Sequence, residues 1–300
     1  MPRSTPPPPT GIGLTALLTA GARVAENIRL DPLYRDHVAP LFLESAGARD
    51  TWWPFPGREE DALWRWLNGY IPLRTRFFDD YLLDAGRRGR HQVVVLGAGL
   101  DTRAFRLPWP CPAPGGEPGD RAATVYEIDL PSVLDFKEAV LTGRRGRPRC
   151  ARAAVRADLR GNWTSGLLAA GFRPDLPTAW LAEGLAAHLG PEENDRLMES
   201  VTRLSAPGSR FATEYWNSAT LRSWSEAMEG APSMDFLRPH LRPGCRGEPE
   251  EWFAAHGWQA DVHALTELAH THLRPRALAS GPRTSAAARA MNRALVVAAT

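Results

Sequence analysis

The stretch that decides the fold is Gln-Val-Val-Val-Leu-Gly-Ala-Gly-Leu-Asp-Thr-Arg, which occupies residues 92–103. Its first five residues form a short apolar, β-branched run, which is typical of a strand buried in a parallel sheet. Gly97 and Gly99 follow this strand. Because glycine has no side chain, a ligand can approach the backbone there and meet the free N–H groups of the next helix. The pattern predicts a nucleotide-like ligand, and a plain strand-to-helix turn is the simpler alternative.

Residue 102 distinguishes between two classes of ligand. A dinucleotide-binding turn has a third glycine at this position, where the helix packs closely beside a pyrophosphate. This chain has Thr102 there, within the bulky polar run Leu-Asp-Thr-Arg. A cofactor without a phosphate does not need so close an approach. Since Lys137 is the only lysine and no Tyr-x-x-x-Lys pair is present, the sequence disfavours an NAD-dependent oxidoreductase.

Similar short runs recur along the chain and alternate with helical patterns. The helical patterns include residues 130–142 and 191–204. Alternation of this kind predicts βαβ units with right-handed crossovers and a parallel sheet, and a last strand at the chain end suits an antiparallel closing strand. We therefore expect an α/β fold of the doubly wound, Rossmann-like class with a seven-stranded, mostly parallel sheet. The strand candidates are residues 92–96, 124–128, 154–157, 178–182, 210–214, 259–264 and 294–299.

The flanking segments suggest helical additions around one core. Helical patterns fill residues 11–90, with breaks expected at Asp31-Pro32, Trp53-Pro54 and Ile71-Pro72. The Pro/Gly-rich residues 110–120 are expected to form a surface loop. We expect a single domain over residues 11–300 after a disordered tail at 1–10. Its parts would be a helical cap (11–90), a cofactor-binding core (91–215), a substrate cap formed by a helical insertion (216–256) and the closing strands (257–300).

The composition is that of an ordinary globular protein, 43% hydrophobic and 23% charged. No stretch approaches the roughly 18 apolar residues of a membrane span, and the 36 basic residues are spread out and matched by 34 acids. We therefore expect neither membrane nor nucleic acid as a partner. Three scattered cysteines form no metal-ligand pattern and suit a reduced cytoplasmic compartment. The apolar run after residue 11 continues past Arg23 at helical spacing, which favours a helix over a signal peptide.

Acidic residues follow three further strand candidates. Asp129 could accept both ribose hydroxyl hydrogens, or it could cap the helix that begins near Pro131. Asp158 could bond an adenine amino group while Leu159 packs on the ring, or it could be a solvated loop residue. Glu183 could hold the cationic end of a methionine moiety, or it could be an acid at a helix N-terminus that stabilises the helix dipole. Because parallel strands end at one edge of a sheet, all three would face the crevice beside Gly97.

These motifs together resemble the leucine carboxyl methyltransferase-related family, which includes actinobacterial methyltransferases and the tetracenomycin-type polyketide O-methyltransferases. The resemblance spans residues 14–215, and the closing strand at 294–299 is consistent with it. It is specific in combination, since no single motif decides it. The matching runs are QVVVLGAGLDTR at 92–103, EIDLP at 127–131, ADL at 157–159, EGL at 183–185, RTRFFD at 74–79, RVAE at 23–26 and Asp31-Pro32.

The resemblance implies S-adenosylmethionine as cofactor and methyl transfer to oxygen, often that of a carboxylate. By motif position, Gly97 and Gly99 would lie near the methionine moiety, Asp129 at the ribose, Asp158 and Leu159 at the adenine, and Glu183 near the methionine amine. Arg74 and Arg23 would hold the methionine carboxylate, for which a guanidinium fork is well suited. A surface ion pair is the alternative for each arginine.

This chain departs from the family pattern at His188, where relatives usually have a tyrosine. A carboxylate acceptor is ionised at neutral pH and needs no base, whereas a hydroxyl acceptor needs one. We therefore hypothesise that His188 contacts the acceptor, and a histidine packed against the core is the alternative. The aromatic residues Trp52, Trp53, Trp216, Trp224 and Phe236 could wall an apolar cavity, or could simply be core.

The sequence favours an O-methyltransferase that acts on a carboxylate or hydroxyl of a small molecule, such as a polyketide-like acid of specialised metabolism. One alternative is a protein C-terminal carboxyl methyltransferase, which would need a channel that admits a peptide end. Another is a non-catalytic relative that binds the cofactor and regulates a partner.

Overall fold

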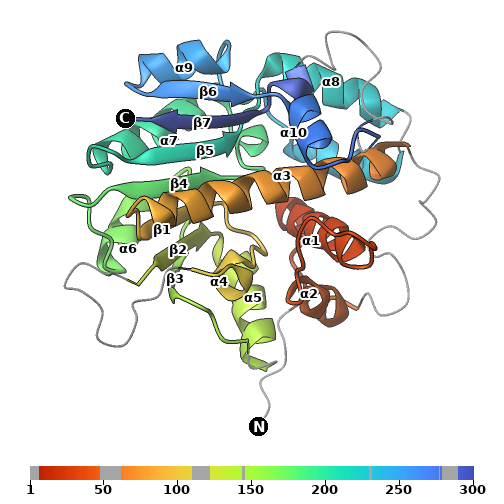
Figure 1. Ribbon diagram of the computed structural model, residues 1–300, viewed down its shortest axis with the longest axis horizontal. Coiled ribbons are helices and arrows are strands. Elements are labelled where there is room, and N and C mark those ends of the chain that lie inside the picture. The colour runs from red at the N-terminus through yellow and green to blue at the C-terminus, as the bar shows by residue number, and fades with distance from the viewer. Residues whose placement is uncertain are drawn as a thin grey trace.

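The computed structural model describes residues 7–47, 62–109, 122–143, 146–229, 232–276, 278 and 290–300. Within them, seven strands form one sheet in the order β3-β2-β1-β4-β5-β7-β6 (Figure 1). Strands β1 to β5 run parallel, and β7 pairs antiparallel with both β5 and β6. This confirms the predicted doubly wound, mostly parallel α/β fold. The strands are β1 (Gln92–Leu96), β2 (Thr124–Asp129), β3 (Ala151–Arg156), β4 (Thr178–Ala182), β5 (Arg210–Glu214), β6 (Gln259–His263) and β7 (Leu295–Ala299).

Burial across the sheet explains why the strands could be recognised in the sequence. Every residue of the central strands β1 and β4 is buried, because helices cover both faces of a parallel sheet. The edge strands β3 and β6 are partly exposed and carry polar side chains. The chain order reverses between β1 and β4, and such a reversal opens a crevice at the carboxyl ends of the strands.

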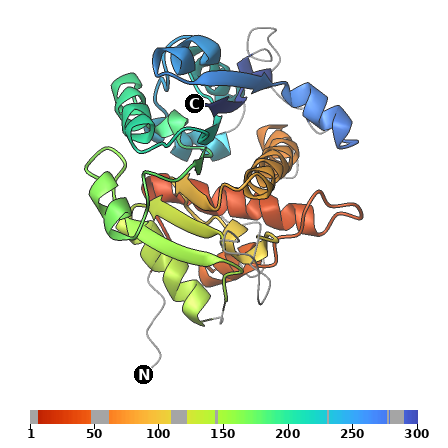
Figure 2. The same cartoon turned by 60° about the vertical axis from the view of Figure 1, so that its left-hand side comes forward.

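Helices surround the sheet and also close its carboxyl edge. The long helix α3 crosses one face of the sheet, and α1 and α2 lie together beside it in Figures 1 and 2. The insertion between β5 and β6 is helical, as expected. The helices are α1 (Leu14–Asn27), α2 (Ala39–Ser45), α3 (Ala62–Arg87), α4 (Arg103–Arg106), α5 (Pro131–Gly143), α6 (Thr164–Ala169), α7 (Pro191–Arg203), α8 (Ser218–Glu229), α9 (Pro249–Ala255) and α10 (Leu265–Thr271), with 3₁₀ turns η1 (Gly11–Gly13), η2 (Ala186–His188) and η3 (Pro232–His240).

Two local expectations were wrong. Helix α3 continues through Pro72, where a break was expected. Proline removes one helical hydrogen bond, but Tyr70, Ile71 and Leu73 beside it are all buried, and this packing outweighs the loss. Pro9 was expected in the disordered tail, but it is buried and would be 2.7 Å from a Cβ placed on Gly13. The expected break at Trp53-Pro54 and the loop at 110–120 lie outside the described residues.

None of the helices in the described ranges is long and apolar enough to span a membrane.

A buried ion pair joins β2 to α5 just before the sheet's carboxyl edge. Lys137 Nζ lies 2.5 Å from Glu127 Oε2, and both side chains are completely buried. Arg152 on β3 also binds that oxygen, with its Nη2 2.7 Å away. Taking charges out of water is costly, so each of these groups depends on its partner. The pair therefore fixes how α5 packs on the strand that carries Asp129.

We expect the Lys137→Met substitution to lower the free energy of unfolding by about 3–5 kcal/mol, because Glu127 would stay buried with only Arg152 to neutralise it. Urea unfolding measures the change. The double variant Lys137→Met, Glu127→Gln should recover part of the loss, since the uncompensated charge is removed. A Lys137→Met protein as stable as the wild type would show that the pair does not matter for stability.

Candidate cofactor and acceptor site

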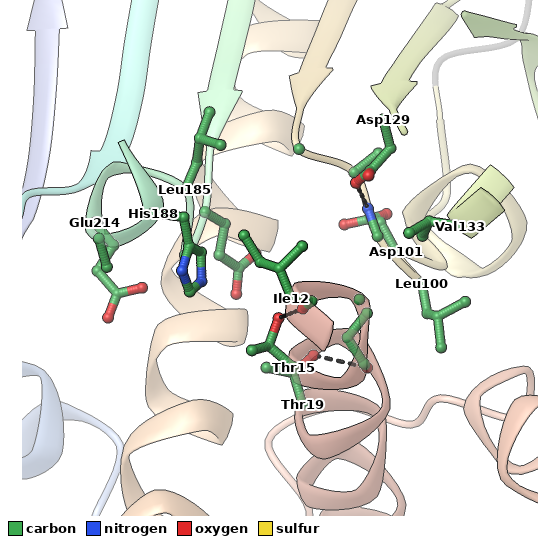
Figure 3. A pocket seen from close by; sticks show the side chains of 18 of the residues that line it. Ile12, Thr15, Thr19, Leu100, Asp101, Asp129, Val133, Leu185, His188 and Glu214 are labelled. Atoms are coloured by element: carbon green, nitrogen blue, oxygen red, sulfur yellow. Dashed lines mark hydrogen bonds between the residues drawn. The ribbon is translucent and has the colours of Figure 1, made fainter. Parts of the chain in front are cut away.

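One cavity of about 380 Å³ lies at the carboxyl ends of β1, β2, β4 and β5. This volume falls within the range of small-molecule sites, about 300–1,000 Å³. Figure 3 shows the strand ends entering from one side and the η1–α1 segment, with Ile12, Thr15 and Thr19, facing them from the other. The cavity is thus enclosed between the sheet edge and the N-terminal helix. It contains every residue that the sequence singled out for the cofactor, together with His188.

The turn after β1 strongly favours glycine at two positions. Gly97 and Gly99 have φ angles of 65° and 48°, in the left-handed region that other residues disfavour. A Cβ on Gly97 would lie 3.1 Å from Leu185 Cδ1, and one on Gly99 would lie 3.2 Å from Ala16 Cβ. The turn therefore packs tightly between the loop after β4 and helix α1. Its backbone forms part of the cavity wall.

Asp129 ends β2 and holds this turn in place. Its Oδ2 accepts a hydrogen bond of 2.6 Å from the Gly99 amide, and its Oδ1 accepts one of 2.6 Å from the Leu130 amide. Neither bond goes to an N–H within helix α5, so the Asp129 side chain does not cap this helix. Burial raises the pKa of Asp129, against the opposing effect of the two amides. No arginine pairs with this carboxylate in the described parts of the chain.

Asp158 and Leu159 lie at the rim of the same cavity. The Asp158 carboxylate is partly exposed and binds the Arg160 guanidinium at 2.6 Å, and this bond lowers its pKa. It therefore combines the two interpretations of the sequence, as a solvated loop residue that also faces the cavity. Leu159 is half-buried and packs against the core.

Glu183 lies at the centre of a connected set of buried charges. Its Oε1 lies 2.8 Å from Arg74 Nε, and its Oε2 lies 2.7 Å from Arg103 Nη1. The contacts extend from there without a gap to α1 and to β5. We call this set the ion-pair chain. Its members are Arg23, Asp36, Arg106, Asp79, Arg103, Asp101, Glu183, Arg74 and Glu214.

The ion-pair chain carries an excess of negative charge. It contains four arginines and five carboxylates. Burial alone would raise the pKa of Asp101, but the charges of Arg103 and Lys137 outweigh it and bring the pKa down to about 2. Burial is likewise outweighed at Glu183, where Arg103 and Arg74 lower the pKa. These carboxylates are therefore ionised at neutral pH. The members of the chain that line the cavity are its four arginines and three of its carboxylates, so the wall presents paired charges of both signs.

Arg74 and Arg23 are both buried members of the chain, so a surface ion pair is the wrong description of either. Arg74 donates from Nη1 to Glu214 Oε2, 2.5 Å away, as well as to Glu183. Arg23 donates to Asp36 at 2.9 Å and to the Leu100 carbonyl at 2.8 Å. A guanidinium has five N–H groups, so each arginine keeps others that can face the cavity.

His188 lies on the 3₁₀ turn η2 and lines the cavity. Its Nδ1 lies 3.0 Å from the backbone carbonyl oxygen of His240. Burial lowers its pKa below the usual histidine value. The ring is therefore part of the cavity wall and is not a histidine packed away in the core.

Aromatic side chains close the end of the cavity near His188. Trp216 and Trp224 are buried and line it, with ring centroids 5.7 Å apart. Phe236 packs against the core nearby but does not line the cavity. Trp52 and Trp53 lie outside the described residues. The cavity's apolar lining also includes Leu67, Tyr70, Ile71, Leu237 and Leu241.

Several members of the ion-pair chain were missed by the sequence analysis. Glu214 ends β5, and the rule that found the acids after the other strands would have found it too. Asp79, Asp101 and Arg103 belong to motifs that carried the family resemblance, but nothing in a linear pattern shows that they meet. Asp36 gave no signal at all. Within the described ranges, no cluster of His, Cys, Asp and Glu side chains could hold a metal ion.

Comparisons with known proteins agree with this geometry. A family model described as leucine carboxyl methyltransferase matches residues 16–202. A protein of Parafrankia sp. (strain EAN1pec), named as a candidate S-adenosyl-L-methionine-dependent methyltransferase, is 44% identical over 266 residues, which are 88% of this chain and 82% of that protein. A Mycobacteroides abscessus protein of the same description is 37% identical and covers 89% of both chains.

Among solved structures, a DUF574 family protein from Streptomyces avermitilis superposes with a TM-score of 0.53 at 14% identity, and the match covers 95% of both chains. This likeness supports the fold. The family model and the relatives together show the family. The chain belongs to the leucine carboxyl methyltransferase family of S-adenosylmethionine-dependent methyltransferases.

Proposed function

We propose that this protein transfers the methyl group of S-adenosylmethionine to an oxygen atom of a small, largely apolar metabolite in the cytoplasm. The acceptor oxygen belongs to a carboxylate or a hydroxyl group. The observation that carries this proposal is the shared cavity of Asp129, Glu183 and His188, in which a polar wall with charges of both signs continues into apolar and aromatic side chains.

The charges of the cavity suit this cofactor. S-adenosylmethionine carries a positive sulfonium and ammonium group and one carboxylate, and it has no phosphate. The ion-pair chain offers the Glu183 carboxylate beside the guanidinium groups of Arg74 and Arg103, so both charges of the cofactor find a partner. The glycine turn leaves room for close approach to the backbone.

Each of these residues would bind one part of the cofactor, according to its position in the cavity. Asp129 would accept hydrogen bonds from the ribose hydroxyls, and Asp158 and Leu159 at the rim would hold the adenine. Glu183 would face the ammonium group near Gly97 and Gly99. Arg74 and Arg23 would bind the methionine carboxylate with their remaining N–H groups, as bidentate guanidinium contacts fix both position and orientation.

The cofactor, when bound, supplies a methyl group that the sulfonium has already activated. The protein then has to exclude water and align the acceptor oxygen with that methyl group, which lowers the barrier through orientation. The η1–α1 segment covers the strand ends and serves the first task. For the second task, an apolar or aromatic acceptor would pack against Trp216, Trp224 and Leu237.

A protein C-terminal carboxyl methyltransferase is the second candidate, and the description of the matching family favours it. The two candidates differ in the size of the acceptor.

We expect Asp129→Asn to weaken S-adenosylmethionine binding about ten- to a hundredfold, because hydrogen bonds to a charged group contribute about 1.5–3 kcal/mol. Isothermal titration calorimetry measures the Kd. The matched control is Asp135→Asn on the exposed side of α5, where the carboxylate pairs with Arg156. Binding should be unchanged in the control. Unchanged binding in Asp129→Asn would contradict the proposal that Asp129 binds the ribose hydroxyls.

We expect labelled methyl groups to appear on small molecules when the protein is incubated with deuterated-methyl S-adenosylmethionine and an extract of the producing cells. Mass spectrometry of the fraction below about 2 kDa detects a shift in mass, and the macromolecular fraction is measured in parallel. Label confined to protein C-termini would favour the second candidate. Cofactor binding with no label in either fraction would indicate a non-catalytic relative and contradict the proposal.

A further inference from the structure

The environment of His188 fixes which of its ring nitrogens carries the hydrogen. Nδ1 lies 3.0 Å from the His240 carbonyl oxygen, and a carbonyl oxygen can only accept a hydrogen bond. Nδ1 must therefore donate. In the neutral ring, Nε2 then carries the lone pair and can accept a hydrogen. The backbone of η3 thus orients a basic nitrogen in the wall of the acceptor end of the cavity.

The surrounding groups keep the ring neutral at the pH of the cell. Burial is the largest influence and lowers the pKa of His188 below its usual 6.5, and His240 and Arg242 act in the same direction. The bond to the His240 carbonyl and the Glu214 carboxylate oppose this effect but do not reverse it. In the view of Figure 3 the ring extends into the space between Glu214 and Ile12.

Charged side chains of both signs line the cavity with His188. Glu183 and Glu214 both line it, and Arg74 is already engaged by these two carboxylates. Arg242 also lines the cavity, but its exposed side chain donates to the carbonyl oxygens of Pro239 and Leu241. These charges do not choose between the two oxygen acceptors, and the choice rests on the lone pair of His188 Nε2.

We propose that the acceptor presents a hydroxyl group, borne by an aromatic or similarly apolar body, and that His188 Nε2 removes its proton. This inference rests on the proposed methyltransferase function and chooses between the two oxygen acceptors. A phenol keeps its proton until about pH 10 in water, so at neutral pH it needs a base at the reacting oxygen. The aromatic residues Trp216 and Trp224 suit such a body.

The step balances without a further reactant. The acceptor oxygen forms a bond to the methyl carbon as the carbon–sulfur bond breaks, and that electron pair stays on sulfur. The hydroxyl proton moves to Nε2, which leaves a methyl ether, S-adenosylhomocysteine and a protonated His188. The imidazolium returns its proton to water when the products leave. His188 thus acts as a general base, a role that typically contributes about 10²- to 10⁴-fold to the rate.

The first experiment identifies the bond that forms. Labelled products from the extract incubation are treated with mild alkali, which hydrolyses methyl esters and leaves methyl ethers intact. We expect the label to survive in products that have lost a free hydroxyl. Label released as methanol would overturn the hydroxyl acceptor and would leave the methyltransferase function standing. The absence of any labelled product would instead contradict the proposed function itself.

The second experiment removes the basic nitrogen of residue 188 and keeps the hydrogen bond to the His240 carbonyl. In His188→Asn, the amide NH₂ takes the place of Nδ1–H and can still donate to the His240 carbonyl, but no basic nitrogen remains. We expect turnover of the extract's acceptor to fall about 10²- to 10⁴-fold while the Kd for S-adenosylmethionine stays the same. The matched control is His270→Asn, an exposed histidine with a similar bond to a carbonyl, at 2.7 Å. Full turnover in His188→Asn would overturn the role of His188.

The pH dependence separates a base from a merely structural histidine. Only neutral His188 can accept the proton, so kcat/KM in the wild type should fall at pH values below the lowered pKa of this residue and stay level above it. The His188→Asn variant should lack this fall. A wild-type profile without it, or the same fall in the variant, would contradict the proposal.

Discussion

The pairing of Glu183 with Arg74 and Arg103 is the interaction on which the site depends. It joins the end of a central strand to helix α3 and to the short helix after the glycine turn. None of these charges could be buried alone, because burying an unpaired ion costs several kcal/mol. The ion-pair chain therefore fixes the N-terminal helices on the sheet edge, and in doing so it closes the cavity.

The same pairing sets the chemistry of the cavity. The members that line the cavity present carboxylates and guanidinium groups side by side, which suits a cofactor that carries both an ammonium group and a carboxylate. Asp129 lies apart from the chain with its charge unpaired by arginine, which suits hydrogen bonds from neutral hydroxyls. At the other end, His188 is neutral and oriented by the His240 carbonyl.

Much of this arrangement could be predicted from the sequence because the strands are short, apolar and separated by helices. The acids after each strand were found for the same reason, since parallel strands end at one edge. The partners of Glu183 could not be found, because Arg74 and Arg103 lie far from it in the chain. The course of α3 through Pro72 likewise depends on tertiary packing. The division of the chain into caps and core stays a prediction.

The most direct measurement is a crystal structure of the protein with S-adenosylhomocysteine. We expect the ligand in the cavity at the strand ends, with its ribose oxygens within about 3 Å of the Asp129 carboxylate and its amino group facing Glu183. A ligand bound elsewhere, or one whose ribose and amino groups avoid these two carboxylates, would contradict the central claim that the strand-end acids form the cofactor site.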